Sequence, residues 1–243
     1  MTLLLLAGTS EARQIAVALA DSGPKVIASM AGVTRNPPDL PVPTRTGGFG
    51  GEAGFRVFLG QNGVTAVIDA THPFAARITD RTARVCAEMG LPYLLFRRAA
   101  WVPGEGDFWR TITREEDAAA HIPLGATVFL ATGRQTLDRF ANLEGRRVIC
   151  RQIDPPTAPF PFEGGEFLIG RPPFSVAHER EIFTALGVDW LVVKNAGGSL
   201  SRSKLDAARD LGLPVLMLSR PLVPDGITVA STLEEALTWA RSR

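Results

Sequence analysis

Short apolar runs alternate with helical hydrophobic patterns along almost the whole of this 243-residue chain. The first apolar run, Leu3–Leu6, leads into Ala7-Gly8-Thr9-Ser10 and then at once into a helical pattern. Strand–helix alternation of this kind is typical of a parallel sheet that is covered by helices on both faces. The alternation therefore predicts an α/β protein.

The predicted elements fall into two similar halves. In the first hundred residues we expect strands over residues 3–7, 25–30, 66–70 and 92–96, with helices over 11–22, 55–62 and 75–89. In the second half we expect strands over residues 127–131, 148–152, 167–169, 190–194 and 215–218, with helices over 115–121, 135–143, 177–186, 203–211 and 233–241. A stretch rich in proline and glycine separates residues 30 and 55 and is expected to be a functional or mobile loop.

The alternation breaks at residues 101–110, which contain the segment VPGEGD. We expect a crossover linker there, between an N-terminal domain (1–100) and a C-terminal domain (111–243). Each domain is predicted to be a Rossmann/flavodoxin-like three-layer α/β domain with a mainly parallel sheet, and the two are expected to face a central cleft. An alternative is that the final helix packs back on the first half.

The composition excludes several classes of function. A net charge of +1 does not favour a surface that coats nucleic acid or binds membranes. No apolar run approaches the roughly 20 residues that span a bilayer, and the two cysteines have no partner motif. The three histidines are scattered, so no metal site is predicted. We expect a cytoplasmic protein that binds neither nucleic acid nor membranes.

The loop Gly8-Thr9-Ser10-Glu11-Ala12 joins the first strand to the first helix. Gly8 permits a close backbone approach, Thr9 or Ser10 can cap the helix, and the free amides of the first turn favour an anion. The loop matches neither the G-x-G-x-x-G fingerprint nor a Walker loop. Plain helix capping explains it equally well at this point.

The segment Asp69-Ala70-Thr71-His72-Pro73-Phe74-Ala75 follows the strand over residues 66–70. An imidazole at the carboxyl end of a parallel strand lies where ligands of such sheets bind. Thr71 and His72 are therefore candidate ligand contacts. The alternative is a rigid turn in which Asp69 or Thr71 accepts backbone hydrogen bonds.

Cationic side chains and glycines follow the strands of the second half. Lys194-Asn195-Ala196-Gly197-Gly198 combines a cation, an amide and two glycines, which suits an anion, although a lysine at a strand end can also simply reach water. Arginines follow three other predicted strands, and together they predict a carboxylate-binding rim unless each forms an ordinary ion pair. These arginines are Arg134, Arg171 and Arg220.

Taken together, these loops resemble the precorrin-6A reductase family of cobalamin biosynthesis. The matching motifs occur in the family's order and span nearly the whole chain: AGTSEA at 7–12, DATHPFA at 69–75, GR at 133–134, RPPF at 171–174, KNAGG at 194–198 and RP at 220–221. One departure is Ala7-Gly8, where the family more often has two glycines.

The resemblance implies NADPH-dependent reduction of precorrin-6A to precorrin-6B by hydride transfer to the macrocycle. It implies NADPH contacts from Gly8, Thr9, Ser10, Glu11, Ala12, Arg35, Thr71 and His72, with Arg35 at the 2′-phosphate. It implies contacts to a polycarboxylate tetrapyrrole from Arg134, Arg171, Lys194, Asn195, Gly197, Gly198 and Arg220, while the apolar ring packs on Phe74, Phe174 or the prolines. His72 is a ligand contact or proton donor, and no catalytic residue is assigned.

Two other functions stay open on the sequence. One is a cofactor-free enzyme similar to uroporphyrinogen-III synthase, and the other is a hinge-type small-molecule binding protein; binding of a pyridine nucleotide distinguishes the reductase from both. A short-chain dehydrogenase is excluded because Tyr93, the only tyrosine, lacks a lysine four residues later. A metal-free or a cobalt-bearing substrate is equally compatible with the sequence, as are neighbouring pathway enzymes as partners.

Overall fold

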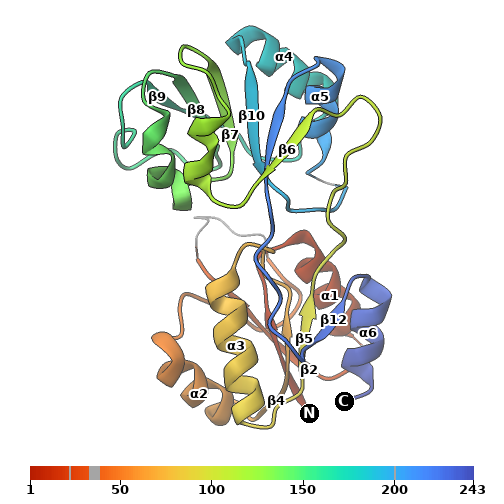
Figure 1. The fold of residues 1–243 in the computed structure, drawn as a ribbon. Helices are drawn as coiled ribbons and strands as arrows, with labels where there is room; N and C mark the ends of the chain where they lie inside the picture. The colour runs from red at the N-terminus through yellow and green to blue at the C-terminus, as the bar shows by residue number, and fades with distance from the viewer. Residues whose placement is uncertain (22, 33–38, 200) are drawn as a thin grey trace. The chain divides into compact units, whose positions relative to one another are not determined.

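The computed structural model describes residues 1–21, 23–32, 39–199 and 201–243. The chain forms two compact units, each with its own sheet (Figure 1). Unit 1 consists of residues 1–99 and 221–243, and unit 2 consists of residues 100–220. The prediction of an α/β fold with two domains built on parallel sheets is confirmed.

Unit 1 has six parallel strands in the order β3-β2-β1-β4-β5-β12. The chain leaves β1 in one direction along the sheet and returns to place β4 on its other side. This is the doubly wound order of dinucleotide-binding folds, in which ligands bind where the order reverses, here between β1 and β4. The strands are β1 (Thr2–Leu6), β2 (Lys25–Met30), β3 (Thr44–Thr46), β4 (Val64–Asp69), β5 (Tyr93–Phe96) and β12 (Thr228–Ala230).

Helices cover both faces of this sheet, which explains why its central strand is apolar throughout. Leu3 and Leu5 pack with α1 and α6, whereas Leu4 and Leu6 point to the opposite face and pack with α2 and α3. Figure 1 shows these two pairs of helices on opposite sides of the sheet. The helices are α1 (Ser10–Ala20), α2 (Gly51–Gln61), α3 (Ala76–Glu88) and α6 (Leu233–Arg241).

Unit 2 repeats the same strand order with different connections. Its parallel sheet reads β9-β8-β7-β10-β11-β6, so its order reverses between β7 and β10. The strands are β6 (Trp109–Ile112), β7 (Thr127–Ala131), β8 (Arg147–Gln152), β9 (Gly165–Ile169), β10 (Trp190–Lys194) and β11 (Val215–Leu218). Two α-helices, α4 (Val176–Leu186) and α5 (Ser203–Asp210), pack on one face with the buried Trp101.

The outermost strand that completes each sheet, β12 in unit 1 and β6 in unit 2, comes from the part of the chain next to the other unit, and this corrects the predicted domain boundaries. β6 follows β5 in the chain but pairs with β11, whereas β12 follows β11 but pairs with β5. Residues 221–243 therefore belong to unit 1 rather than to the second domain, and α6 packs against α1. The predicted linker 101–110 begins with a tryptophan that is buried in the core of unit 2 and ends inside β6.

Two predicted α-helices of unit 2 are 3₁₀ helices, η1 (Glu115–Ala120) and η2 (Arg134–Leu143). η1 is only six residues long, and η2 is kinked at Thr136, whose φ of −120° is not helical. Short segments of this kind gain little from the i→i+4 hydrogen bonds that propagate an α-helix. Their apolar residues still pack on the sheet, since Leu137, Phe140 and Leu143 are buried.

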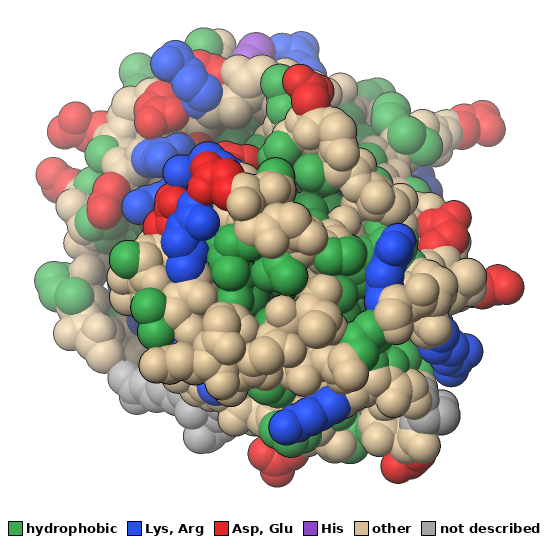
Figure 2. Space-filling model, turned by 90° about the horizontal axis from the view of Figure 1, so that it is seen from below, with side chains coloured by type: hydrophobic (Ala, Val, Ile, Leu, Met, Phe, Trp, Pro, Cys, Tyr) green, Lys and Arg blue, Asp and Glu red, His purple; other side chains and the backbone are tan. Residues whose placement is uncertain are grey.

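Charges of both signs are interspersed on the face of the molecule that Figure 2 shows. In unit 1, Arg56 pairs with Glu52 and Glu88, and Arg84 pairs with Glu52, so α2 and α3 share a mixed ion-pair network. Among the described residues, no helix is long and apolar enough to cross a membrane.

Candidate functional site

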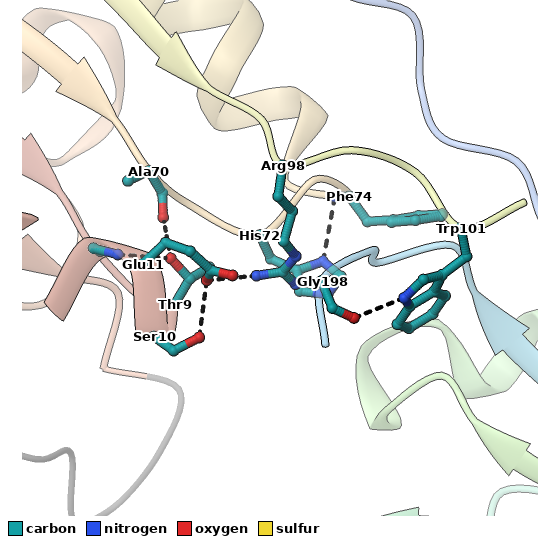
Figure 3. Close-up of polar contacts among 10 residues, drawn as sticks. Thr9, Ser10, Glu11, Ala70, His72, Phe74, Arg98, Trp101 and Gly198 are labelled. Carbon is teal, nitrogen blue, oxygen red and sulfur yellow. Dashed lines mark hydrogen bonds and ion pairs between the residues drawn. The ribbon is translucent and has the colours of Figure 1, made fainter. Parts of the chain in front are cut away.

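The loop that follows β1 is built around Gly8 and Thr9. Gly8 has a φ of +142°, which favours glycine, and a Cβ placed there would meet no described heavy atom within 4 Å. Thr9 is the N-cap of α1: its hydroxyl accepts a hydrogen bond from the amide of Ala12 at 3.1 Å and donates one to the carbonyl of Ala70 at 2.7 Å. Thr9 thus fastens the loop after β1 to the loop after β4 (Figure 3).

Glu11 and Arg98 form an ion pair beside this loop. The Arg98 Nη1 lies 2.6 Å from the Glu11 Oε2, and Ser10 donates to the same carboxylate at 2.9 Å (Figure 3). Burial opposes ionisation of Glu11, but the charge of Arg98, its hydrogen bond and those from the Glu11 amide and Ser10 hold the pKa of Glu11 below its usual value. Arg98 therefore offsets a negative charge at the start of α1, where an anion would otherwise be repelled.

The loop after β4 is held by the buried carboxylate of Asp69. Its Oδ1 accepts hydrogen bonds from the amide and the hydroxyl of Thr71, at 3.0 and 2.6 Å. Its Oδ2 accepts from the hydroxyls of Thr79, at 2.8 Å, and Tyr93, at 3.1 Å. Burial and the charge of Asp69 raise the pKa of Tyr93, so this phenol stays a hydrogen-bond donor.

His72 lies at the tip of this fixed loop and is exposed. Its Nδ1 accepts a hydrogen bond from the amide of Phe74 at 3.3 Å (Figure 3). That bond ties the imidazole to the backbone of its own loop. The rigid turn and the ligand contact, which the sequence left as alternatives, are therefore compatible: Asp69 builds the turn, and the turn presents His72.

The residues at the β1–β4 switch point fit a dinucleotide. The first-turn amides of α1 have no partner within the helix, the helix start favours a phosphate, and Gly8 leaves its backbone accessible. Ala12 is fully buried, which permits the close packing of helix on strand that such folds need. Of the predicted contacts, Gly8, Thr9, Ser10, Glu11, Ala12, Thr71 and His72 all belong to these two loops, whereas Arg35 lies outside the described residues.

In unit 2, the loop that follows β10 is held by Trp101. Both amide atoms of Asn195 bond the backbone of Trp101, each at 2.9 Å. The indole Nε1 of Trp101 donates to the carbonyl of Gly198 at 2.7 Å (Figure 3). Gly197 and Gly198 have φ values of +68° and +76°, so the turn depends on glycine. Asn195 thus has a structural role, which its predicted ligand contact did not anticipate.

The predicted cations of unit 2 all lie in loops or strand ends at the carboxyl edge of the sheet. Lys194 donates to the hydroxyl of Thr136 at 3.2 Å, and burial lowers the pKa of Lys194. The Nε of Arg220 donates to the carbonyl of Asn195 at 2.7 Å. Arg134 is exposed at the start of η2, and the exposed Arg171 forms an ion pair at 3.5 Å with Asp154, whose side chain is largely buried.

Sequence reasoning missed a buried ion pair in unit 2. Arg151 and Glu179 bond through both oxygens, at 2.6 and 2.8 Å, and Glu179 is fully buried. The signal was available: Glu179 is four residues before the buried Phe183 on α4, which places both on the inward face of that helix. It also missed Arg98, which follows β5.

Nothing in the described part of the chain groups three or more histidine, cysteine or acidic side chains as metal ligands would be grouped. Cys86 and Cys150 are buried free thiols, and burial raises their pKa values to about 12 and about 11, with Asp69 adding to the effect at Cys86. These thiols are therefore protonated and unreactive at neutral pH.

Comparison with known proteins identifies the family. The model of the precorrin-6x reductase CbiJ/CobK family matches residues 2–241. The chain is 42% identical to a precorrin-6A reductase of Rhodobacter capsulatus, over 98% of this chain and 94% of the relative, and 30% identical to a cobalt-precorrin-6A reductase of Priestia megaterium, over 97% and 96%. A solved structure described as CobK precorrin-6A reductase superimposes with a TM-score of 0.93 at 41% identity, over 98% of this chain and 95% of that one. The protein is a member of the precorrin-6x reductase CbiJ/CobK family.

Proposed function

We propose that the protein catalyses the NADPH-dependent reduction of precorrin-6A to precorrin-6B in cobalamin biosynthesis. One observation carries the proposal: two family motifs far apart in the sequence, AGTSEA and DATHPFA, are joined by the Thr9–Ala70 hydrogen bond at the switch point of a doubly wound sheet. Family membership favours this function over a cofactor-free synthase or a binding protein. A cytoplasmic location and association with neighbouring pathway enzymes are part of the same proposal.

In this proposal unit 1 binds the cofactor. The loop from Gly8 to Ala12 holds the pyrophosphate through the backbone amides that the Thr9 cap leaves free, and Thr71 and His72 contact the same ligand from the loop after β4. Arg35 binds the 2′-phosphate. Bound NADPH supplies the hydride, and the protein supplies position and charge.

Unit 2 supplies charges for the substrate. A precorrin carries many carboxylate arms, and guanidinium and ammonium groups pair with carboxylates. We assign this role to Arg134, Arg171, Lys194 and Arg220, with the loop of Gly197 and Gly198 shaped by the contacts of Asn195 and Trp101. Apolar parts of the macrocycle pack on Phe74 and Phe174.

The metal-free ring is the proposed substrate. The matched relatives named precorrin-6A reductase are 38–42% identical to this chain, whereas those named cobalt-precorrin-6A reductase are 26–30% identical. Anaerobic assays with the metal-free and the cobalt-bearing ring in parallel test this choice. A higher kcat/KM for the cobalt-bearing ring would refute it.

The first experiment is a titration with NADPH and with NADH, followed by nicotinamide fluorescence. We expect NADPH to bind at least about tenfold more tightly, which corresponds to roughly 1.4 kcal/mol. Gly8→Ala should weaken NADPH binding. Gly63→Ala is the matched control, because Gly63 also has a positive φ and an open Cβ position but lies at the amino end of β4.

The titration is repeated with precorrin-6A present, because a cofactor site that substrate completes would otherwise look empty. Binding of neither nucleotide under both conditions would contradict the proposal and favour a cofactor-free enzyme or a binding protein. Nucleotide binding is then followed by an anaerobic assay of precorrin-6A reduction.

A further inference from the structure

Unit 2 contains a small pocket whose polar lining includes none of the contacts assigned above. It has a volume of about 140 Å³ and lies at the carboxyl ends of β7, β8 and β9, beside the start of α5. Its polar lining comes from Arg151, Gln152, Ser201, Ser203 and Lys204, and its apolar lining includes Phe174. The pocket belongs wholly to unit 2.

Gln152 is the feature of this pocket that calls for a ligand. The residue is the last of β8 and is 7% exposed. Neither its Oε1 nor its Nε2 has a hydrogen-bond partner among the described residues, although both atoms are buried. A buried amide without partners destabilises a fold, so the hydrogen bonds of Gln152 call for an occupant of the pocket, either water or a bound molecule. Gln152 offers one acceptor and two donor hydrogens to an occupant.

One wall of the pocket is rigid and carries no net charge. Arg151 is held by two hydrogen bonds to Glu179, and its guanidinium lies 4.2 Å from the centre of the Phe174 ring. The positive charge of Arg151 is thus matched by Glu179. Phe174 lies over the guanidinium and gives the pocket an apolar side.

Lys204 supplies the charge that the wall lacks. It lies near the start of α5, and its Nζ donates to the carbonyl of Ser201 at 2.5 Å. Burial, helped by the charge of Arg151, lowers the pKa of Lys204 to about 8, with Glu179 opposing. The N-cap of α5, Arg202, makes no side-chain cap bond, so the helix start adds partial positive charge on the same side.

Size and charge together define the occupant. Pockets that enclose a drug-sized ligand measure roughly 300–1,000 Å³, so 140 Å³ accommodates one arm of a large ligand rather than its ring. A cation, a helix start and an amide donor favour a carboxylate, and the apolar side favours the methylene groups that carry it.

We propose that this pocket binds one carboxylate arm of the tetrapyrrole, with Gln152 and Lys204 as its polar contacts. This inference rests on the proposed function and adds a specificity site to it. Neither residue belongs to the motifs on which the family resemblance was recognised. The arm that enters the pocket fixes the orientation of the ring about its own axis.

The test uses two readouts on the full chain, thermal unfolding without ligand and binding of an octacarboxylic porphyrin as a stable fluorescent probe. Gln152→Leu removes the unpartnered amide, so we expect its Tm to rise by about 2–6 °C while the Kd for the porphyrin weakens about tenfold. Gln61→Leu, at the exposed end of α2, is the matched control and should change neither. A lower Tm with an unchanged Kd would make Gln152 a structural group and overturn the proposal.

Lys204 provides a second test that does not depend on how Gln152→Leu folds. Lys204→Met should weaken porphyrin binding at least tenfold, and Lys204→Arg, which keeps the charge, should restore most of it. Lys25→Met is the control, because Lys25 is exposed at the amino end of β2. Equal affinity in the Met and Arg variants, whatever its value, would refute a charge-based contact.

A kinetic measurement separates this inference from the proposed function. With precorrin-6A and NADPH, Gln152→Leu should raise KM for the precorrin while NADPH affinity stays unchanged. Normal reduction with an unchanged precorrin KM overturns the pocket assignment and leaves the reductase intact. Failure of the wild-type protein to bind nucleotide or to reduce the ring refutes the proposed function, and the porphyrin titration then still decides whether the pocket takes carboxylates.

Discussion

Replacement of Lys204 by Met should change how the stability of the protein depends on pH. The pKa of Lys204 is about 8 in the folded protein and 10.5 in the unfolded reference. Because the unfolded chain binds this proton more tightly, the free energy of unfolding rises with pH between about 8 and 10.5. Below pH 8 the folded protein carries the full penalty of a buried ammonium group.

The magnitude follows from the same shift. One pKa unit corresponds to about 1.4 kcal/mol, so the contribution is at most about 3–4 kcal/mol, and partial exposure of Lys204 reduces it to about 3 kcal/mol or less. Arg151 and Glu179 are the charged groups that act on Lys204, and both remain in the variant. We therefore expect Lys204→Met to be more stable than the wild type at pH 7, by up to about 3 kcal/mol, and the difference to shrink towards pH 10.5.

Urea unfolding at pH 7, 8, 9 and 10, followed by tryptophan fluorescence, measures this difference directly. Other groups that titrate in this range are common to both proteins and cancel in the comparison. A difference in unfolding free energy that stays constant from pH 7 to 10 would refute the reasoning. Saturation with the octacarboxylic porphyrin should flatten the curve of the wild type, because a bound carboxylate stabilises the ammonium form.

Three further predictions concern named contacts. Arg98→Met should weaken NADPH binding about tenfold (roughly 1.4 kcal/mol) in fluorescence titrations, because Glu11 then repels the phosphates. Adding Glu11→Gln to this variant should restore most of the NADPH affinity. If the affinity does not recover, Arg98 contacts the cofactor itself. Glu179→Gln should lower the free energy of unfolding by about 3–5 kcal/mol in urea melts, because it leaves the buried charge of Arg151 without a partner. Glu181→Gln, at an exposed position of the same helix, should change the free energy of unfolding by less than about 0.5 kcal/mol. Equal effects of the two substitutions would contradict this prediction. His72→Ala should raise KM or Kd more than it lowers kcat in steady-state assays, and a loss of kcat above about 100-fold at unchanged KM would instead make His72 the proton donor.

The regular parts of the fold were predictable because their periodicity is strong. Leu3–Leu6 and the helical pattern after it gave β1 and α1, and the strand over residues 66–70 gave β4. β3, β6 and β12 were not predicted, since each has only three or four residues and several of these are exposed. Nothing local distinguishes such a segment from a loop, because its strand conformation depends on a neighbour that is distant in the sequence.

The candidate site divides in the same way. A glycine, histidine or lysine directly after an apolar strand pattern is visible in the sequence, so the positions of Gly8, His72 and Lys194 at strand ends were predictable. The roles of Asn195 and Gln152 were not. Both are amides at strand ends, yet Asn195 is satisfied by Trp101 whereas Gln152 has no partner in the described structure. Only the three-dimensional arrangement distinguishes these two cases.

The placement of β12 in unit 1 and of β6 in unit 2 determines the order in which the protein can be completed during synthesis. Unit 2 is one continuous stretch, residues 100–220, and has all its strands as soon as β11 has emerged from the ribosome. The first residues of unit 1 are synthesised first, but the unit is completed last, because β5 has no partner on its outer edge until β12 is made and the apolar face of α1 stays uncovered until α6 is made. Unit 2 can therefore fold before unit 1 is complete, and the last 23 residues (221–243) complete the sheet of unit 1.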